Sequence, residues 1–300
     1  MTFPMLEKPL GDYCYFNGIK TYYNSAEGQD LFKPTDSVIY YESIRFQRKV
    51  MLFFEDHMVR LHRSVEAKEN FRVDSNLLFE TASKLINEQV PELSDGNLRI
   101  VLTSKSILIH FSDVYYPSEE MYSKGIVSAT LSWDRFEPQV KVFRADFKQA
   151  VADVFAKETS CGIPYEVLLR DSNGKIYEGS RSNFFVLHDK TVYSPPASQI
   201  LIGITRKYVM LSLEKAGFKY LEKSFSLEEI ISMRDQSEID NLPFSVFVTS
   251  SPFDILPIRS IDNEIFFSAD CPQLQKLSQE YQSIVNYYIQ SRQNEDMNNT

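Results

Sequence analysis

The chain has 300 residues, of which 43% are hydrophobic and 13% aromatic, enough for a large core and for two domains of ordinary size. Its 41 acidic and 32 basic residues give a formal net charge of -9, which argues against binding of nucleic acid or of an anionic membrane surface. Neither a run of about eighteen apolar residues for a membrane span nor a signal peptide at the start is visible, so we expect a cytoplasmic protein.

The cysteines and histidines indicate neither disulfides nor a metal site. Cys14, Cys161 and Cys271 are odd in number and far apart, which is typical of free thiols in a reducing compartment. His57 and His62 have a spacing that does not place both side chains on one helical face. We therefore expect no bound metal ion.

The first half of the chain predicts an α+β domain. Runs rich in β-branched and aromatic residues alternate with turns, and one run with acidic residues at its start has apolar residues at helical spacing. The predicted elements are strands over 37–46 and 50–54 around a turn at 47–49, a helix over 55–71, and strands over 98–103, 106–111 and 126–132.

A change of composition at 133–139 (WDRFEPQ) predicts a connection between an N-terminal domain, 1–132, and a larger C-terminal domain, 140–291. The polar residues 292–300 predict a disordered tail. In the C-terminal domain, turn residues and Gly217 mark the ends of elements. The predicted elements there are helices over 145–159, 205–216 and 271–291 and strands over 165–170, 175–177, 182–187 and 245–250.

Two segments of the second half suit a bound ligand. The polar sequence 177–183 (YEGSRSN) interrupts apolar strands, and Gly179 lets a ligand approach the backbone; the alternative is a solvated β-turn. Gly203 precedes a helix whose first amides, those of Ile204 and Thr205, can hold an anion such as phosphate. An N-cap by Thr205 is the alternative, and it is compatible with anion binding.

One helical face of the first half could also bind a phosphate. His57 and Arg60 are three residues apart, and a guanidinium there can give a phosphate two hydrogen bonds. The alternative is a surface pair of Asp56 with Arg60. The spacing of these residues does not by itself decide between phosphate binding and a surface ion pair.

The order of several motifs along the chain is more specific. The motifs are Tyr41-Glu42-Ser43, His57-x-x-Arg60-Leu61, a lysine after the connection, Glu178-Gly179-Ser180-Arg181-Ser182-Asn183-Phe184, Pro195-Pro196, Leu201-x-Gly203-Ile204-Thr205-Arg206, and Thr249-Ser250-Ser251 with Pro257. Together they resemble the class IV pyridoxal-phosphate aminotransferases, a family of branched-chain aminotransferases, D-amino acid aminotransferases and 4-amino-4-deoxychorismate lyases. The resemblance implies a two-domain fold, α/β and α+β, like that of D-amino acid aminotransferase (fold type IV), with pyridoxal 5′-phosphate between the domains, and a homodimer.

In this family a lysine shortly after the domain connection holds the cofactor, and two candidates exist. Lys141 lies in the apolar, strand-like sequence QVKVFR, where burial disfavours the ammonium and leaves a neutral amine as nucleophile and base. Lys148 lies off the apolar face of a predicted helix, where a solvated ammonium is the ordinary state. We therefore predict Lys141 as the catalytic lysine.

The resemblance assigns further residues to the cofactor and the substrate. Glu178 would pair with the protonated pyridine nitrogen and keep the ring an electron acceptor, while Asn183 would satisfy backbone groups of its turn. The phosphate would be held by Arg60, the amides of Ile204 and Thr205 and the hydroxyls of Thr205 and Ser251, with Leu201 on the ring face and with Tyr41 and Ser180 on the substrate side.

Two departures from the family pattern bear on the substrate. The segment 33–40 lacks the glycines that members usually have there, which predicts a narrower substrate mouth. Pro252 removes an amide from the loop that follows Ser251. Tyr115, Tyr116 and Phe136 are aromatic residues that could line the pocket, and no arginine identifies itself as a clamp for the substrate carboxylate.

The sequence thus predicts an aminotransferase that moves an amino group between an apolar, branched-chain-like amino acid and a 2-oxo acid through a lysine aldimine. An apolar donor is favoured because no basic cluster is present for a second carboxylate. The alternative is 4-amino-4-deoxychorismate lyase, which uses the same lysine; Glu42 favours the aminotransferase because lyases often carry threonine there. A third hypothesis is a cofactor-binding protein without turnover, against which the presence of Lys141, Glu178 and Arg60 together argues.

Overall fold

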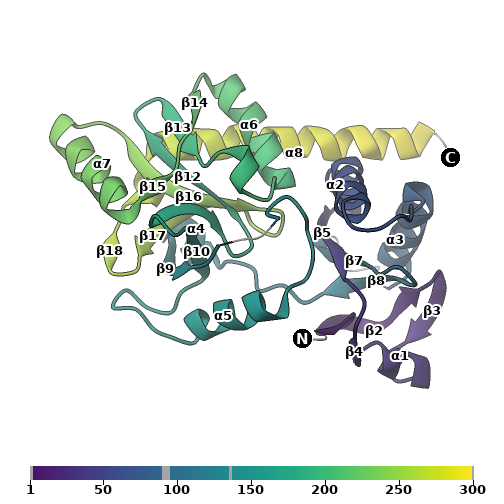
Figure 1. Ribbon diagram of the computed structural model, residues 1–300. Helices are drawn as coiled ribbons and strands as arrows, with labels where there is room; N and C mark the ends of the chain where they lie inside the picture. The colour runs from purple at the N-terminus through teal and green to yellow at the C-terminus, as the bar shows by residue number, and fades with distance from the viewer. Residues whose placement is uncertain (1–2, 90–94, 135–136, 299–300) are drawn as a thin grey trace. The chain divides into compact units, whose positions relative to one another are not determined.

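The structure is a computed structural model and describes residues 3–89, 95–134 and 137–298 (Figure 1). The chain divides into two compact units: the first consists of Met1–Tyr115, Val140–Asp146 and Val285–Thr300, and the second of Tyr116–Gln139 and Phe147–Ile284. Within the described ranges, no helix is long and apolar enough to cross a membrane.

The first unit is built on a six-stranded antiparallel sheet. The strand order is β3 (Ile19–Tyr22), β2 (Pro9–Phe16), β8 (Ile107–Ser112), β7 (Asp95–Leu102), β5 (Tyr40–Gln47) and β6 (Val50–Met51). The pair β1 (Phe3–Pro4) and β4 (Pro34–Thr35) and the short helix α1 (Ala26–Asp30) belong to the same unit. Strands β5 and β6 form the predicted hairpin, and Arg48 and Lys49 in its turn both have positive φ.

Helices α2 (Phe54–Glu66) and α3 (Ser75–Gln89) pack on one face of this sheet. Alternate residues of β5, among them Tyr40, Glu42 and Ile44, are buried on that face. Met58 and Leu61 of α2 belong to the same apolar cluster. The strand period thus places the carboxylate of Glu42 in an apolar core, where it needs hydrogen-bond partners.

The second unit is built on a ten-stranded mixed sheet. The strand order is β14 (Lys219–Glu222), β13 (Thr191–Ser194), β12 (Asn183–His188), β16 (Phe244–Ser250), β17 (Asp254–Ile261), β9 (Ile126–Ser132), β10 (Glu166–Arg170), β11 (Lys175–Gly179) and β15 (Phe225–Ser226), with β18 (Glu264–Ile265) beside β17. Strand β9 pairs in parallel with both β10 and β17, and β13 pairs in parallel with β14. The α-helices are α4 (Glu119–Lys124), most of α5 (Ala145–Phe155), α6 (Ile204–Ala216), α7 (Leu227–Asp240) and the first part of α8 (Pro272–Asn298), up to Ile284.

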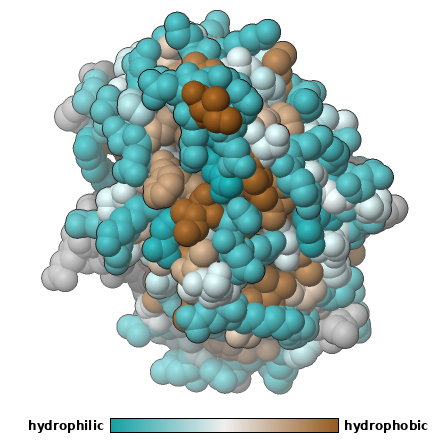
Figure 2. All heavy atoms as spheres, turned by 90° about the vertical axis from the view of Figure 1, so that its left-hand side faces the viewer, coloured by the Kyte–Doolittle hydropathy of each residue, from teal (hydrophilic) through white to brown (hydrophobic). Residues whose placement is uncertain are grey.

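One core cluster of the second unit lies between its sheet and α7, whose Ile230 packs with Phe184 of β12 and Val246 of β16. A second cluster joins Val151 of α5 to Val167 and Leu169 of β10. Helix α7 begins with a capping box of Ser226 and Glu229. Figure 2 shows the side of the molecule on which Figure 1 places α7 and β18; hydrophobic groups there are interleaved with hydrophilic side chains.

The domain boundaries of the structure differ from the predicted ones. Strand β9 was predicted to end the first domain, but it belongs to the second unit because it pairs with β10 and β17. The segment Val140–Asp146, predicted to open the second domain, belongs to the first unit. There the amide of Phe143 donates to the carbonyl of Ile39, just before β5, at 2.9 Å.

The predicted disordered tail is also corrected. Helix α8 (Pro272–Asn298) continues through Arg292, and its part from Val285 onwards belongs to the first unit. Arg292 Nη2 binds Glu55 Oε1 at 2.5 Å and Nη1 binds Glu295 Oε2 at 2.8 Å. Ion pairs therefore hold this polar segment, which has no apolar pattern. Residues 299–300 lie outside the described residues.

Candidate active site

Glu42, His57 and Arg60 form a buried charged cluster in the first unit. The carboxylate of Glu42 is fully buried and accepts hydrogen bonds from Arg60 Nε at 2.8 Å and from Arg60 Nη2 at 2.5 Å. Nδ1 of His57, which is also buried, lies 2.7 Å from Glu42 Oε2. The helical face that carries His57 and Arg60 is thus turned to β5, and the alternative of Arg60 as a surface residue is wrong.

The charges of this cluster follow from its contacts. Burial would raise the pKa of Glu42, but the charge and hydrogen bonds of Arg60 and the hydrogen bond of His57 lower that pKa to about 2. Burial and the charges of Arg60 and Lys141 lower the pKa of His57. The hydrogen bond to Glu42 raises it, but by less. Near neutral pH the cluster is therefore a carboxylate, a guanidinium and a neutral imidazole that donates its Nδ1–H to Glu42.

Lys141 lies beside the same strand and helix. Its backbone N–H donates to Ser64 Oγ of α2 at 3.1 Å, and the neighbouring Val142 forms a β-bridge with Tyr40 of β5. The side chain of Lys141 is half-buried, whereas that of Lys148 in α5 is exposed. The structure thus ties Lys141 to α2, the helix that carries Arg60.

The ring of Tyr41, a predicted substrate-side residue, is bordered by two basic side chains. Lys141 Nζ lies 4.7 Å and Arg99 Cζ 5.4 Å from the ring centroid. Arg99 comes from β7 and pairs with Ser43 of β5. Sequence reasoning missed Arg99 because its approach to Tyr41 depends on the register of two strands, although a charged residue inside an apolar strand was a visible signal.

His110 of β8 pairs with Arg99 across the sheet and was also missed. Its Nδ1 lies 2.7 Å from the carbonyl of Phe111, a hydrogen bond that raises the pKa of His110. Burial and the charge of Arg99 outweigh this bond and lower the pKa to about 3. The imidazole is therefore neutral. Its Nε2 is buried and has no hydrogen-bond partner in the described part of the chain.

In the second unit, the loop at 201–203 is bound to the two strands that flank the polar sequence 177–183. Buried Glu178, in β11, accepts the N–H of Leu201 at 3.1 Å. Asn183, the first residue of β12, donates to the carbonyl of Leu201 at 2.8 Å and accepts the N–H of Gly203 at 3.1 Å. A Cβ at Gly203 would lie 2.2 Å from Asn183 Oδ1. Asn183 thus satisfies backbone groups as predicted, but those of this loop rather than of its own turn.

A buried carboxylate that the sequence analysis did not single out, Glu166 of β10, organises the turn at 179–182. It accepts hydrogen bonds from Ser180 Oγ at 2.6 Å, from Ser182 Oγ at 2.7 Å and from the amides of Val167 and Ser180. A Cβ at Gly179 would lie 2.0 Å from Ser182 Oγ and 3.0 Å from Glu166 Cδ. The space beside Gly179 is therefore filled by the protein's own side chains, which corrects the expectation of ligand access there, and the hydroxyl of Ser180 is bound to Glu166.

The first turn of α6 has the predicted open amides. Its N-cap is Gly203, without a side-chain cap, and Ile204 and Thr205 are the first two helical residues, both buried. The N-cap by Thr205 is thus wrong, because Thr205 lies inside the helix. The amides of Ile204 and Thr205 have no carbonyl within the helix to bind, so this end suits an anion.

Hydroxyl groups follow at the end of β16. Thr249 is buried opposite Asn183, and its Oγ1 has no hydrogen-bond partner in the described ranges. Ser250 Oγ donates to the carbonyl of Arg181 at 2.8 Å. Ser251, predicted to bind phosphate, lies half-buried in the turn that follows β16.

The residues of each unit fit pyridoxal phosphate. The first unit offers an amine at Lys141 and a guanidinium at Arg60, which suit an aldehyde and a phosphate. The second unit offers the buried carboxylate of Glu178 for a protonated pyridine nitrogen, the open end of α6 for an anion and the unpartnered hydroxyl of Thr249. Among residues 3–89, 95–134 and 137–298, no group of three or more His, Cys, Asp or Glu side chains is placed to hold a metal ion.

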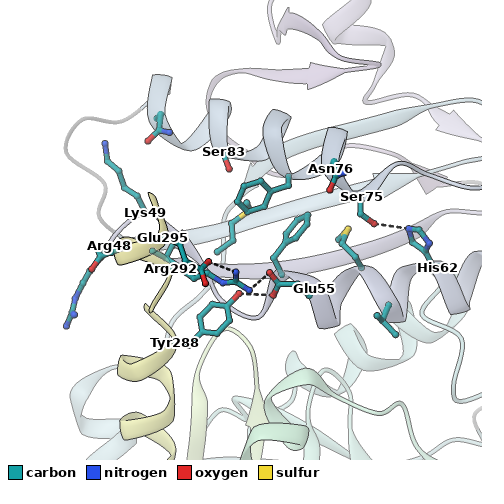
Figure 3. Close-up of a pocket in the computed structure, with 18 of the residues that line it drawn as sticks. Arg48, Lys49, Glu55, His62, Ser75, Asn76, Ser83, Tyr288, Arg292 and Glu295 are labelled. Carbon is teal, nitrogen blue, oxygen red and sulfur yellow. Dashed lines mark hydrogen bonds and ion pairs between the residues drawn. The ribbon is translucent and has the colours of Figure 1, made fainter. Parts of the chain in front are cut away.

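The first unit also contains a separate groove between α2, α3 and the end of α8 (Figure 3). Its volume is about 1480 Å³, and its lining includes Phe54, Met58 and Phe79, but neither Lys141 nor Arg60. Figure 3 shows Arg292 and Tyr288 of α8 turned to Glu55 at one end of the groove and His62 bound to Ser75 at the other. Helix α2 thus presents one face to β5 and Lys141 and another to this groove.

Two of the remaining aromatic candidates lie at the surface. Tyr115 is 66% exposed and Tyr116 is 40% exposed. Phe136 lies outside the described residues.

Comparisons with known proteins show the family to which the chain belongs. Residues 40–261 match the model of the family described as amino-transferase class IV, and the chain belongs to this family. Because members of the family depend on pyridoxal phosphate, the chain is a pyridoxal-phosphate-dependent class IV aminotransferase.

Two relatives show how the similarity is distributed. A branched-chain-amino-acid aminotransferase of Pseudomonas aeruginosa is 28% identical over 173 residues, which cover 57% of this chain and 53% of that protein. The match thus spans about half of that relative. A D-alanine aminotransferase of Bacillus licheniformis is 23% identical over 249 residues, which cover 75% of this chain and 79% of the relative.

Solved structures show that the fold is that of fold type IV enzymes. A branched-chain amino acid aminotransferase from Escherichia coli has a TM-score of 0.73 at 21% identity and covers 92% of this chain and 95% of its own. One from Thermoproteus uzoniensis with norvaline has a TM-score of 0.69, at 21% identity, with 92% and 95% covered. A putative 4-amino-4-deoxychorismate lyase from Legionella pneumophila has a TM-score of 0.64 at 20% identity, with 80% and 89% covered.

Proposed function

We propose that the protein transfers the amino group of an apolar, branched-chain-like amino acid to a 2-oxo acid, with Lys141 as the lysine that holds the cofactor. The observation that carries this proposal is the position of Lys141: its amide is bound to α2, the helix of Arg60, and its side chain lies at the ring of Tyr41. The names of several relatives, which are branched-chain aminotransferases, support the choice of substrate. We further propose a homodimer, as the family resemblance implies, and a cytoplasmic location, as the sequence predicts.

When bound, pyridoxal phosphate supplies an aldehyde that joins covalently to an amine and a ring that takes up electrons from the substrate. Lys141 would bind the aldehyde and, once released from it, carry the proton between the substrate Cα and the cofactor. Its half-buried position lowers the cost of a neutral amine. Arg60, fixed by two hydrogen bonds to Glu42, would hold the phosphate with a guanidinium of defined orientation.

The residues of the second unit would hold the other parts of the cofactor. Glu178 would accept a hydrogen bond from the pyridine nitrogen and favour its protonated form, since a buried carboxylate stabilises a nearby cation. The amides of Ile204 and Thr205 and the hydroxyls of Thr205 and Ser251 would bind phosphate oxygens. Leu201, whose amide is fixed by Glu178, would cover the ring face.

The substrate side would be formed by Tyr41 and Ser180, to which we add Arg99. Its guanidinium lies over the Tyr41 ring and offers a positive charge for the substrate carboxylate. The hydroxyl of Ser180 is engaged by Glu166, so we assign this residue to shaping the turn beside the substrate. We assign Arg99 as the partner of the substrate carboxylate, and a single such partner would suit an apolar donor.

The alternative activity is that of a 4-amino-4-deoxychorismate lyase, because the Legionella pneumophila structure with this putative activity has a similar fold. Glu42 favours the aminotransferase, because the residue is fully buried and bound to Arg60. Threonine, frequent in lyases at this place, could not form such an ion pair.

The test is a visible-absorbance titration of the cofactor-loaded protein with single amino acids. We expect L-leucine, L-isoleucine or L-valine to convert the band of bound pyridoxal phosphate into that of pyridoxamine phosphate, and 2-oxoglutarate to reverse the change. Conversion by D-alanine alone would contradict the proposed substrate. Release of pyruvate from 4-amino-4-deoxychorismate, with no conversion by any amino acid, would establish the lyase instead.

A further inference from the structure

We propose that Ser64 is a positioning residue that fixes the direction of the Lys141 side chain relative to Arg60. Ser64 lies in α2 and is fully buried. Its hydroxyl donates to the carbonyl of Arg60 at 3.0 Å and accepts the backbone N–H of Lys141 at 3.1 Å. A serine hydroxyl has one proton and two lone pairs, so it makes both bonds at once. The inference rests on the proposed role of Lys141 as the cofactor lysine.

The backbone around Lys141 shows why this one bond matters. The N–H of Val142 donates to the carbonyl of Val140 at 3.1 Å, which closes a three-residue turn with Lys141 at its apex. Neighbouring contacts, the bridge of Val142 to Tyr40 and the bond of Phe143 to Ile39, tie the segment to β5. The Lys141 amide ties the apex to α2, and the orientation of that peptide sets the direction of the Cα–Cβ bond.

The same hydroxyl links the amine to the phosphate-binding guanidinium. Ser64 lies one helical turn after Arg60 and is bound to the carbonyl of that residue. Arg60 is in turn fixed by both oxygens of Glu42. Ser64 thus fixes the position of Lys141 relative to the helical turn that carries Arg60. A cofactor held at both its aldehyde and its phosphate requires a constant distance between Lys141 and Arg60.

Other helical serines show what is particular to Ser64. A serine hydroxyl commonly bonds the carbonyl four residues earlier, and Ser212 of α6 and Ser237 of α7 do so at 2.9 and 2.6 Å. Both residues are buried. Throughout the described ranges, neither of their hydroxyls accepts a hydrogen bond, whereas that of Ser64 accepts one from Lys141. The bond to a distant segment is therefore a separate property of Ser64.

The experiment compares Ser64→Ala and Ser64→Thr with Ser237→Ala, which loses the same helical bond without a second partner. Amide hydrogen exchange of the peptide containing Lys141 is measured in the cofactor-free protein, and the dissociation constant of pyridoxal phosphate is measured by absorbance. We expect Ser64→Ala to accelerate exchange at the Lys141 amide about tenfold and to weaken cofactor binding about tenfold, as for the loss of one hydrogen bond. Ser64→Thr, which keeps the hydroxyl, should retain most of the protection and affinity.

Several results would overturn the inference. Unchanged exchange at Lys141 in Ser64→Ala would show that the hydroxyl does not hold this amide. Faster exchange with unchanged cofactor affinity would show that the bond does not position the amine, and equal losses in Ser237→Ala would indicate general destabilisation. Borohydride reduction and peptide mapping of the loaded wild-type protein identifies the lysine that is attached to the cofactor. Attachment to another lysine would refute the proposed function itself, whatever the exchange data show.

Discussion

Glu42 keeps its charge inside an apolar core because Arg60 and His57 bind it. Its pKa is lowered from an ordinary value of 4.5 to about 2, so the folded protein holds this proton less tightly than the unfolded chain. The stabilisation is therefore fully present above about pH 4.5 and is lost as the pH falls through about 2. We predict a contribution on the order of 3 kcal/mol to the free energy of unfolding at neutral pH.

Urea unfolding of the cofactor-free protein at a series of pH values tests this prediction. Glu42→Gln should be less stable than the wild type near pH 7, since the variant leaves the charge of Arg60 unpaired in the core. The difference should shrink between about pH 5 and pH 2, because only the wild type has a carboxylate to protonate. A difference that stays constant over this range would mean that the pKa of Glu42 is the same in the folded protein as in the unfolded chain.

At the level of single elements, the turn at 179–182 depends on the absence of a side chain at Gly179. A Cβ there would lie 2.0 Å from Ser182 Oγ, so we predict that Gly179→Ala destabilises the protein by about 1–3 kcal/mol. The double variant Gly179→Ala/Ser182→Ala removes the nearest obstacle and should recover part of this loss relative to Ser182→Ala alone. Thermal unfolding of the four proteins measures the coupling, and strict additivity would show that the two residues do not compete for one space.

The end of α8 offers a second comparison between neighbouring residues. The ring of Tyr288 lies 4.8 Å from that of Phe53, and its hydroxyl donates to Glu55 at 3.0 Å, whereas Tyr287 is 74% exposed. We predict that Tyr288→Ala lowers the free energy of unfolding by about 1–3 kcal/mol and Tyr287→Ala by less than about 0.5 kcal/mol. Equal effects of the two variants in chemical denaturation would show that α8 does not pack on the first unit through Tyr288.

The elements also show what a sequence can predict. Strand β9 has the predicted bounds Ile126–Ser132, and α6 differs from its prediction by one residue, because apolar runs and a terminal glycine mark them locally. Helix α7 was not predicted although its capping box, Ser226 with Glu229, is a local signal. Few of its residues are buried, among them Ile230, so its apolar period is weak. The hairpin strand predicted over 50–54 is shorter because Phe54 begins α2.

For the whole molecule, a sequence predicts poorly those contacts whose two residues are far apart along the chain. Motifs predicted Arg60, Lys141 and Glu178 as candidates, because each lies in a distinctive local sequence. Their partners depend on tertiary structure: Glu42 is 18 residues from Arg60, and Ser64 is 77 residues from Lys141. The same reason explains why the unit boundary was placed too late, since the pairing of β9 with β10 and β17 decides its membership.

The most direct test of the account is the identity of the lysine that holds the cofactor. The protein is loaded with pyridoxal phosphate, reduced with borohydride, digested and analysed by mass spectrometry. We predict the phosphopyridoxyl group on the peptide that contains Lys141, its loss in Lys141→Ala and its retention in Lys148→Ala. A label on Lys148, or a label that persists in Lys141→Ala, would contradict the account.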